Sequence, residues 1–120
     1  MWSKPGKRVL VVDDEAMIRR LLTRFLTSGG HRVYEAETSA QALSIFQTHK
    51  PFDALLCDLR LGAENGWAVA KMIFDAQPTI AVLMLTGCLD AGVPPDGLRY
   101  RVMIKPFTPD ELKTALERLW

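Results

Sequence analysis

Polar side chains that could do chemistry together follow directly after four short apolar runs of the chain. The acids Asp13, Asp14 and Glu15 follow residues 9–12, Asp58 follows residues 54–57, Thr86 follows residues 80–85, and Lys105 follows residues 102–104. Carboxylates drawn together repel one another and raise one another's pKa unless a cation lies between them. All the candidate ligands are oxygens, with no His or Cys at metal-ligand spacing, which indicates a hard cation such as Mg²⁺ rather than zinc.

A carboxylate beside Mg²⁺ and a lysine favours phosphoryl transfer onto that carboxylate. Mg²⁺ held by one or two carboxylates keeps coordination sites for phosphate oxygens, and Lys105 adds a compact positive charge that suits a phosphoryl group. Catalysis of this transfer comes mostly from positioning and charge neutralisation. Each residue alone also has a structural explanation, since Asp14 could cap a helix and Thr86 could be a satisfied loop hydroxyl. The joint arrangement carries the hypothesis that Asp58 accepts a phosphoryl group.

Strands and helices that alternate along the chain would bring these residues to one place. The four apolar runs predict strands buried on both faces, and the alternating residues 32–36 predict a half-exposed edge strand. Apolar residues at helical spacing lie between the strands, and Thr108, Pro109 and Glu111 form the strongest helix start. The pattern predicts an α/β fold with a mainly parallel sheet covered on both faces. Ligands of such sheets bind beyond the carboxyl ends of the strands, where the polar residues lie.

The segment 89–100 fits the helical pattern least well. Its Gly92, Pro94, Pro95 and Gly97 leave room for at most about one or two helical turns. We therefore expect any fourth helix to be short or irregular.

Length and composition indicate one domain outside the membrane. The 120 residues carry 15 Lys and Arg against 14 Asp and Glu, which gives a net charge of +1. Because no basic run exceeds Arg19-Arg20, direct binding to nucleic acid is not expected. The longest apolar run is far shorter than the roughly 20 residues that span a bilayer, and no signal peptide opens the chain. We predict a single domain over residues 1–120 in the cytoplasm, with residues 1–7 as a lead that is disordered or added for expression.

From about Arg8 to Leu119, the sequence resembles the receiver domain of two-component response regulators. The matching positions are the acid pair Asp13 and Asp14, the phosphoacceptor Asp58, the glycine Gly66, the switch hydroxyl Thr86, and the Lys105-Pro106 pair. The resemblance implies a flavodoxin-like (βα)5 fold, a doubly wound parallel sheet with strand order 2-1-3-4-5. It also implies a cis peptide bond between Lys105 and Pro106, a form that X-Pro bonds reach at modest cost.

The same resemblance implies a mechanism and its partners. Asp58 would attack the phosphohistidine of a sensor histidine kinase or phosphotransfer protein, with Lys105 paired to the phosphoryl group and Thr86 moving to hydrogen-bond it. The implied ligands of Mg²⁺ are the carboxylates of Asp13, Asp14 and Asp58 and the backbone carbonyl of Arg60. The domain would promote only its own phosphorylation and dephosphorylation, and an output domain would be attached to it or separate from it.

The chain departs from the usual receiver pattern at four places. Gly62 stands where the family usually has Pro, Gly87 replaces the usual Ala, Val102 replaces an aromatic residue, and the segment from Thr86 to Lys105 is shorter than in many relatives. Val102 cannot swing between exposed and buried rotamers as a Tyr does. We therefore expect phosphorylation to be read through reordering of residues 88–100. We also expect the bulky Arg60 to shield the acyl phosphate from water.

Two other functions remain open. A Mg²⁺-dependent phosphohydrolase could use Asp58 as its nucleophile, but such enzymes generally need a second acid two residues on, where this chain has Arg60, and a cap. A degenerate receiver could act only as a protein interaction module, although the complete set of acids, hydroxyl and lysine argues against it. His31 and His49 are not expected to be catalytic because neither joins the strand-end residues. Trp67 is expected to pack against the sheet.

Overall fold

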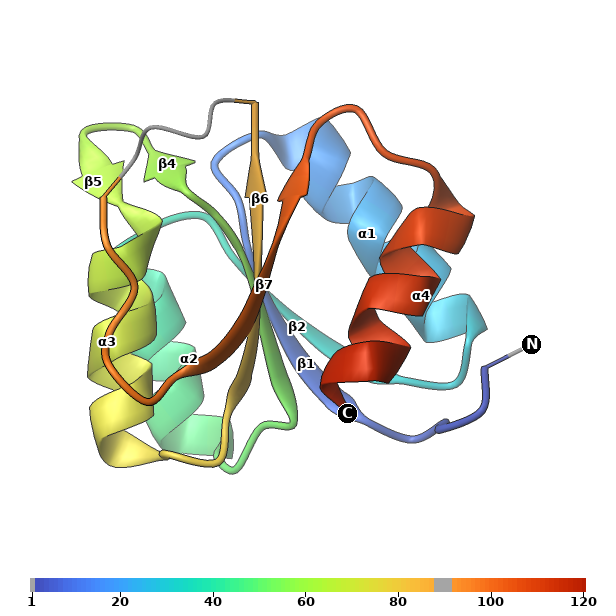
Figure 1. The fold of residues 1–120 in the computed structure, drawn as a ribbon, viewed down its shortest axis with the longest axis horizontal. Helices are drawn as coiled ribbons and strands as arrows, with labels where there is room; N and C mark the ends of the chain where they lie inside the picture. Colours follow the sequence, from blue (N-terminus) through green and yellow to red (C-terminus); the bar gives the residue numbers. More distant parts are fainter. Residues whose placement is uncertain (1, 88–91) are drawn as a thin grey trace.

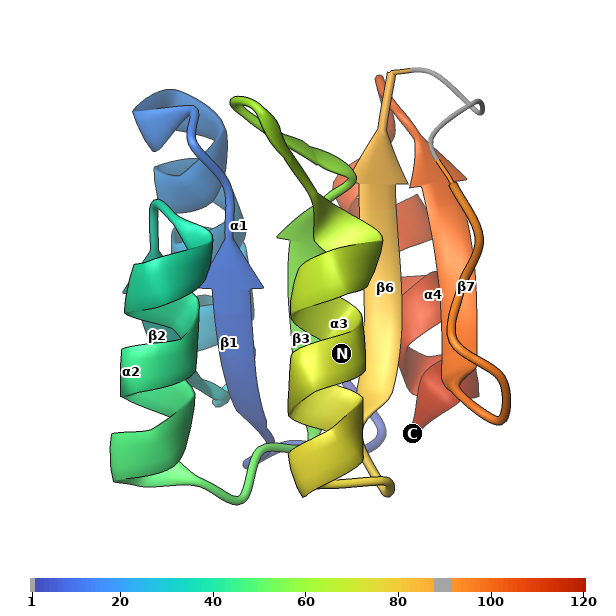
Figure 2. The same cartoon turned by 90° about the vertical axis from the view of Figure 1, so that its left-hand side faces the viewer.

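A parallel sheet lies between two layers of helices in the computed structural model, which describes residues 2–87 and 92–120 (Figure 1). The main strands are β1 (Arg8–Val12), β2 (Arg32–Ala36), β3 (Ala54–Asp58), β6 (Ala81–Thr86) and β7 (Arg99–Ile104). The helices are α1 (Ala16–Ser28), α2 (Ser39–His49), α3 (Gly66–Ala76) and α4 (Pro109–Leu119). Helices α2 and α3 cover one face of the sheet, and α1 and α4 cover the other (Figures 1 and 2).

The order of the strands confirms the predicted doubly wound topology. The five strands lie in the order β2-β1-β3-β6-β7, and every pair is parallel. This is the order 2-1-3-4-5 of the flavodoxin-like fold once a small antiparallel hairpin is set aside. The hairpin, β4 (Arg60–Leu61) with β5 (Glu64–Asn65), was not expected, and it follows directly after β3. Ligands of such sheets bind beyond the carboxyl ends of the strands, here where β1, β3 and β6 end.

Residues along each central strand alternate between two cores. Leu10 and Leu55 face α2 and α3, whereas Val9 and Leu56 face α1 and α4. Every residue of β3 and β6 is buried, as expected for strands that are covered on both faces. The residues at the carboxyl end of the sheet therefore follow strands that are packed on both faces.

Strand β7 corrects one prediction, because residues 102–104 are not buried on both faces. Val102 is 37% exposed and Ile104 is 51% exposed. The physical reason is that β7 lies at the edge of the sheet and that residues 92–98, which precede it, form no helix to cover the face beside α3. Tyr100 covers part of this face through an edge-to-face contact with Trp67, with 5.2 Å between the ring centroids.

The prediction of a short or irregular fourth helix agrees with the described part of this segment, since residues 92–98 contain a turn at 96–97 and no helix or strand. Residues 88–91 lie outside the described residues, and the predicted reordering of residues 88–100 stays a prediction. Within residues 2–87 and 92–120, no helix is both long and apolar enough to cross a membrane.

The start of α4 agrees with the sequence prediction, and the N-terminal segment packs against the end of α4. The hydroxyl of Thr108 accepts from the backbone N–H of Glu111, and the Glu111 side chain accepts from the Thr108 N–H at 2.9 Å, which confirms the predicted capping box. Residues 2–7 form neither helix nor strand. The indole of Trp2 nevertheless packs against His31 and Trp120, with ring centroids 4.6 and 5.9 Å away.

Candidate functional site

Three carboxylates meet at the carboxyl ends of β1 and β3. Asp13 directly follows β1 and Asp58 ends β3, and these two strands are parallel neighbours in which Val12 lies opposite Cys57. Oxygen atoms of Asp13, Asp14 and Asp58 all lie within 4.8 Å of one another. Asp13 and Asp58 are buried, and Asp14 is exposed at the mouth of the site.

Asp13 is held by several hydrogen bonds, but one of its carboxylate oxygens has no hydrogen-bond partner. Its backbone N–H donates to the carbonyl of Ala36 at 3.1 Å, and its Oδ1 accepts from the N–H of Glu15 at 2.8 Å. Its Oδ2 is buried and has no hydrogen-bond partner. Burial raises the pKa of Asp13 above its ordinary value, although the Glu15 N–H and the charge of Lys105 act in the opposite direction. A buried carboxylate oxygen with no donor fits a metal ligand.

Asp14 points toward the hairpin rather than capping α1. Its Oδ2 accepts from the backbone N–H of Gly62 at 3.0 Å, and no side chain caps the first turn of α1. Gly62 has φ of 58°, in the left-handed region that favours glycine. A proline at this position could neither donate this hydrogen bond nor adopt this φ. The departure from the usual receiver pattern therefore has a structural purpose.

Lys105 brings a positive charge to the three acids from the end of β7. Its Nζ lies 3.1 Å from Oδ2 of Asp58, 3.6 Å from Oδ2 of Asp13 and 3.9 Å from Oε1 of Glu15. Burial alone lowers the pKa of Lys105, but the hydrogen bond to Asp58 and the nearby acids outweigh it and raise that pKa. The peptide bond to Pro106 is cis, as the resemblance implied.

Thr86 and Arg60 complete the surroundings of Asp58. Thr86 ends β6 and is 2% exposed, and its carbonyl accepts from the N–H of Lys105 at 2.7 Å, which joins two neighbouring strand ends. The backbone N–H of Arg60 donates to Oδ1 of Asp58 at 3.0 Å. The side chain of Arg60 is exposed. The role of its carbonyl as a metal ligand stays a prediction.

Gly66 allows the start of α3 to approach the end of β3 closely. A Cβ at this position would lie 2.5 Å from the carbonyl oxygen of Asp58 and 3.0 Å from Cα of Leu59. The N–H of Gly66 donates to the carbonyl of Leu59 at 2.8 Å. Both contacts are with backbone, which has little room to move, so the glycine is required by packing.

Three other residues that the sequence analysis or their chemistry singles out are buried in the protein interior. His31 is buried among the rings of Trp2 and Trp120, away from the strand-end acids. Cys57 is fully buried, and burial raises the pKa of its thiol. Trp67 is buried in the core between the sheet and α3, as predicted.

Sequence reasoning missed two residues that hold the acids in place. Gly62 binds Asp14, and Arg19 of α1 donates from Nη1 to the backbone carbonyl of Asp13 at 2.6 Å. A glycine four residues after Asp58 was a visible signal for the first contact. No sequence pattern pointed to the second, because it depends on the direction in which a helical side chain lies.

Comparison with known proteins decides the family. The sequence profile described as "Response regulator receiver domain" matches residues 9–117. The chain belongs to the response regulator receiver family. Receiver domains are signalling domains that bind Mg²⁺ at an acidic cluster of this kind and that interact with histidine kinases and output domains. The receiver domain described here is therefore not an enzyme in the usual sense.

Individual relatives agree with this assignment. The chain is 33% identical to "Probable transcriptional regulator ycf27" of Cyanophora paradoxa, over 94% of this chain and 48% of that protein. It is 33% identical to "Phosphate regulon transcriptional regulatory protein PhoB" of Pseudomonas aeruginosa, over 93% of this chain and 51% of that protein. The chain thus spans about half the length of these curated relatives.

Solved structures of receivers superpose on nearly the whole chain. A response regulator receiver domain protein from Clostridium thermocellum has a TM-score of 0.83 and 27% identity, covering 94% of this chain and 93% of that one. TrrA from Thermotoga maritima, solved in complex with Mg²⁺ and BeF, has a TM-score of 0.82 and 29% identity, covering 95% and 99%.

Proposed function

We propose that this receiver domain is a phosphoacceptor switch that takes a phosphoryl group onto Asp58. The observation that carries the proposal is the position of Asp58, whose two oxygens face the ammonium of Lys105 and the N–H of Arg60 inside a group of three carboxylates. The negative charge of Asp58 repels an anionic phosphoryl group. The ammonium of Lys105 and the N–H of Arg60 offset that charge, so the phosphoryl group can approach Asp58.

The carboxylates fit the Mg²⁺ that the family implies. Three oxygen ligands lie within 4.8 Å of one another, and the buried Oδ2 of Asp13 lacks a hydrogen-bond donor. We infer that the metal is held by Asp13, Asp14 and Asp58 with the carbonyl of Arg60. When bound, Mg²⁺ neutralises the charge of the phosphoryl oxygens.

Each residue around Asp58 has its own role in the transfer. A carboxylate oxygen of Asp58 attacks phosphorus, the bond between phosphorus and the donor imidazole nitrogen breaks, and the electron pair of that bond stays on the imidazole. Lys105 stabilises the negative charge of the transferred group, and the hydroxyl of Thr86 turns toward a phosphoryl oxygen. The Arg60 N–H holds the other oxygen of Asp58, and its exposed side chain shields the acyl phosphate.

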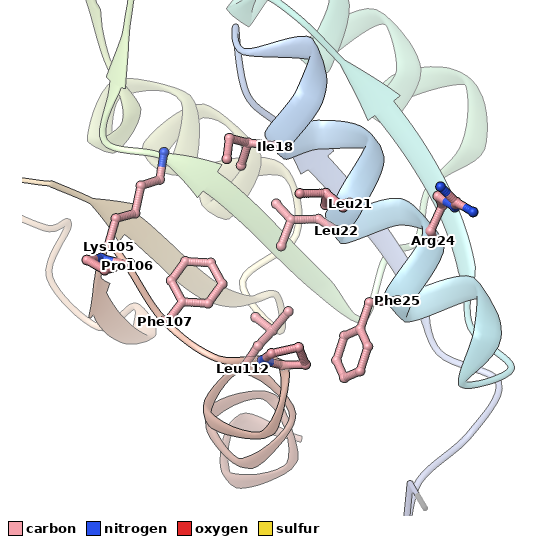
Figure 3. Close-up of a pocket in the computed structure, with 10 residues that line it drawn as sticks. Ile18, Leu21, Leu22, Arg24, Phe25, Lys105, Pro106, Phe107 and Leu112 are labelled. Atoms are coloured by element: carbon pink, nitrogen blue, oxygen red, sulfur yellow. The ribbon is translucent and has the colours of Figure 1, made fainter.

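An apolar groove beside the site suits a protein as the phosphoryl donor. The groove has a volume of about 620 Å³ and runs between α1 and α4 from Lys105 toward Phe25 (Figure 3). Its apolar lining comes from Ile18, Leu21, Leu22, Phe25, Phe107 and Leu112, among others. Because Lys105 both lines the groove and contacts Asp58, a helix seated there would bring its own side chains next to the acceptor. A sensor histidine kinase or phosphotransfer protein is the proposed occupant.

The decisive experiment is phosphorylation by a small donor. The protein is incubated with acetyl phosphate and Mg²⁺ and examined by intact mass, and beryllofluoride binding is followed by tryptophan fluorescence. We expect one phosphoryl adduct on the wild-type chain and none on Asp58→Asn. Absence of an adduct on the wild-type chain, with the fold intact by circular dichroism, would contradict the proposal.

The same experiment separates the two alternative functions. Steady turnover of an organic phosphate without an accumulated adduct would indicate a phosphohydrolase. A folded chain that binds neither Mg²⁺ nor beryllofluoride would indicate an interaction module, which the exposed Tyr100, Val102 and Ile104 of β7 could serve. The output domain, the cytoplasmic location and the absence of direct contact with nucleic acid stay predictions for this domain.

A further inference from the structure

Arg19 links the acidic site to the edge strand of the sheet. Its side chain leaves α1, and its Nη1 donates to the backbone carbonyl of Asp13 at 2.6 Å. Its Nε lies 3.2 Å from Oε1 of Glu35, a residue of β2. The Arg19 side chain is 15% exposed, so much of this contact is sheltered from water.

The contact matters because of what it completes around Asp13. The N–H of Asp13 is bound to Ala36, its Oδ1 is bound to Glu15, and its carbonyl is bound to Arg19. The remaining polar atom is Oδ2, which faces Lys105 and has no hydrogen-bond donor. Three fixed atoms therefore determine where the fourth atom lies, and the fourth is the proposed metal ligand.

We propose that Arg19 is a positioning residue for Mg²⁺ binding, with Glu35 holding its guanidinium in place. By fixing the turn from Asp13 to Glu15, Arg19 keeps Asp13 and Asp14 directed at Asp58. This inference rests on the proposed function, since it concerns the metal that the phosphoryl transfer uses. Hydrogen bonds that orient metal ligands typically change metal affinity by about 10- to 100-fold when they are removed.

If Arg19 acted only through its charge, its removal would have the opposite effect on Mg²⁺ affinity. A cation near a metal site repels the metal, so removal of that charge would strengthen Mg²⁺ binding. Positioning predicts weaker binding instead. Arg19→Gln shows whether Mg²⁺ binding becomes weaker or stronger. Arg19→Lys keeps the charge but lacks the forked donor geometry of the guanidinium. Arg20→Gln is the control, because it removes a charge from the next residue of the same helix, which is exposed.

The experiment is a calorimetric Mg²⁺ titration of the four chains, with urea unfolding of each in EDTA. We expect Arg19→Gln to weaken Mg²⁺ binding about tenfold, Arg19→Lys to weaken it as well, and Arg20→Gln to stay within about twofold of wild type. Exchange of the Glu15 amide, followed by NMR without metal, should be faster in both Arg19 variants and unchanged in Arg20→Gln.

The outcomes separate this inference from the function beneath it. Unaltered or tighter Mg²⁺ binding by Arg19→Gln, with a wild-type chain that binds Mg²⁺ and forms the Asp58 adduct, overturns the inference alone. A wild-type chain that binds no Mg²⁺ overturns both. If Arg19→Gln does not fold, Arg19→Lys decides, since wild-type affinity in that variant contradicts a role for the forked contact.

Discussion

The ammonium of Lys105 lies 3.1 Å from Oδ2 of Asp58, although the two residues are 47 positions apart in the chain. The same ammonium is 3.6 Å from Oδ2 of Asp13. One side chain therefore offsets the repulsion between two buried carboxylates in the metal-free protein. The arrangement ties the stability of the domain to the same contacts that would serve phosphoryl transfer.

Lys105→Met removes this charge and keeps an unbranched side chain. We expect the metal-free variant to be less stable than wild type by about 1–3 kcal/mol, because the buried acids lose a charged hydrogen bond. Urea unfolding in EDTA measures the difference. Lys113→Met, which changes a lysine of α4 away from the acids, is the matched control and should stay within about 0.5 kcal/mol. Equal stability of both variants would contradict the prediction.

Asp13 makes the stability of the metal-free domain depend on pH. Burial raises the pKa of Asp13 above 3.8 in the folded protein, so the folded state holds this proton more tightly than the unfolded state. The contribution of Asp13 to the free energy of unfolding is therefore largest in acid and falls as pH rises above about 3.8. At pH 7 the metal-free Asp13→Asn variant should be more stable than wild type.

Mg²⁺ should offset the lower stability of the wild-type chain relative to Asp13→Asn at pH 7. At a concentration about ten times its dissociation constant, bound metal adds about 1.4 kcal/mol to the free energy of unfolding. Asp13→Asn should gain much less from the same addition, because it lacks the buried carboxylate. Thermal unfolding of both chains with and without Mg²⁺ provides the comparison, and an equal gain in both chains would argue against Asp13 as a ligand.

Gly66→Ala tests the close approach of α3 to the end of β3. The new Cβ would meet the carbonyl of Asp58 and the Cα of Leu59 at 3.0 Å or less, and overpacking of this kind costs about 1–3 kcal/mol. We expect a matching loss of stability and slower formation of the Asp58 adduct. Gly87→Ala is the control, since a Cβ there has no neighbour within 4 Å among the described residues. Similar behaviour of the two variants would show that the contact is unimportant.

The sheet and the meeting of Asp13 with Asp58 could be predicted from the sequence. Each acid follows an apolar run, and neighbouring parallel strands end at the same edge of a sheet. The exposure of residues 102–104 could not be predicted in this way, because an apolar run looks the same whether or not a helix covers it. That outcome depends on residues 92–98, which form no covering helix.

The contacts that hold the acids were beyond sequence reasoning for a different reason. Gly62 reaches Asp14 through a positive φ, and Arg19 reaches the Asp13 carbonyl through the direction of one side chain. Both depend on tertiary structure rather than on periodicity. Residue type and position after the apolar runs identified the acids, but they did not show which residues hold the acids in place.

His31 should make stability depend on pH at the opposite end of the sheet. Its Nδ1 accepts from the N–H of Lys7 at 3.2 Å, and burial lowers the pKa of His31 below 6.5. The unfolded state therefore takes up this proton first, and the His31 contribution to stability is lost as pH falls below about 6.5. His31→Asn keeps an oxygen acceptor but does not titrate. The stability difference between wild type and this variant, measured by urea unfolding at pH 7.5 and 5.5, should shrink at the lower pH.

Trp2 fills a slot that Gly29→Ala would close. A Cβ on Gly29 would overlap the indole ring of Trp2, whereas the φ of −83° at Gly29 suits alanine, so the clash falls on the indole rather than on the backbone. We expect the variant to expel Trp2 from its contacts with Phe25 and Trp120, with a red shift in fluorescence and a loss of about 1–3 kcal/mol. In a Trp2→Ala background the same change should cost less than about 0.5 kcal/mol, since nothing remains to be displaced. Additive effects in the double variant would show that Trp2 does not occupy the slot in solution.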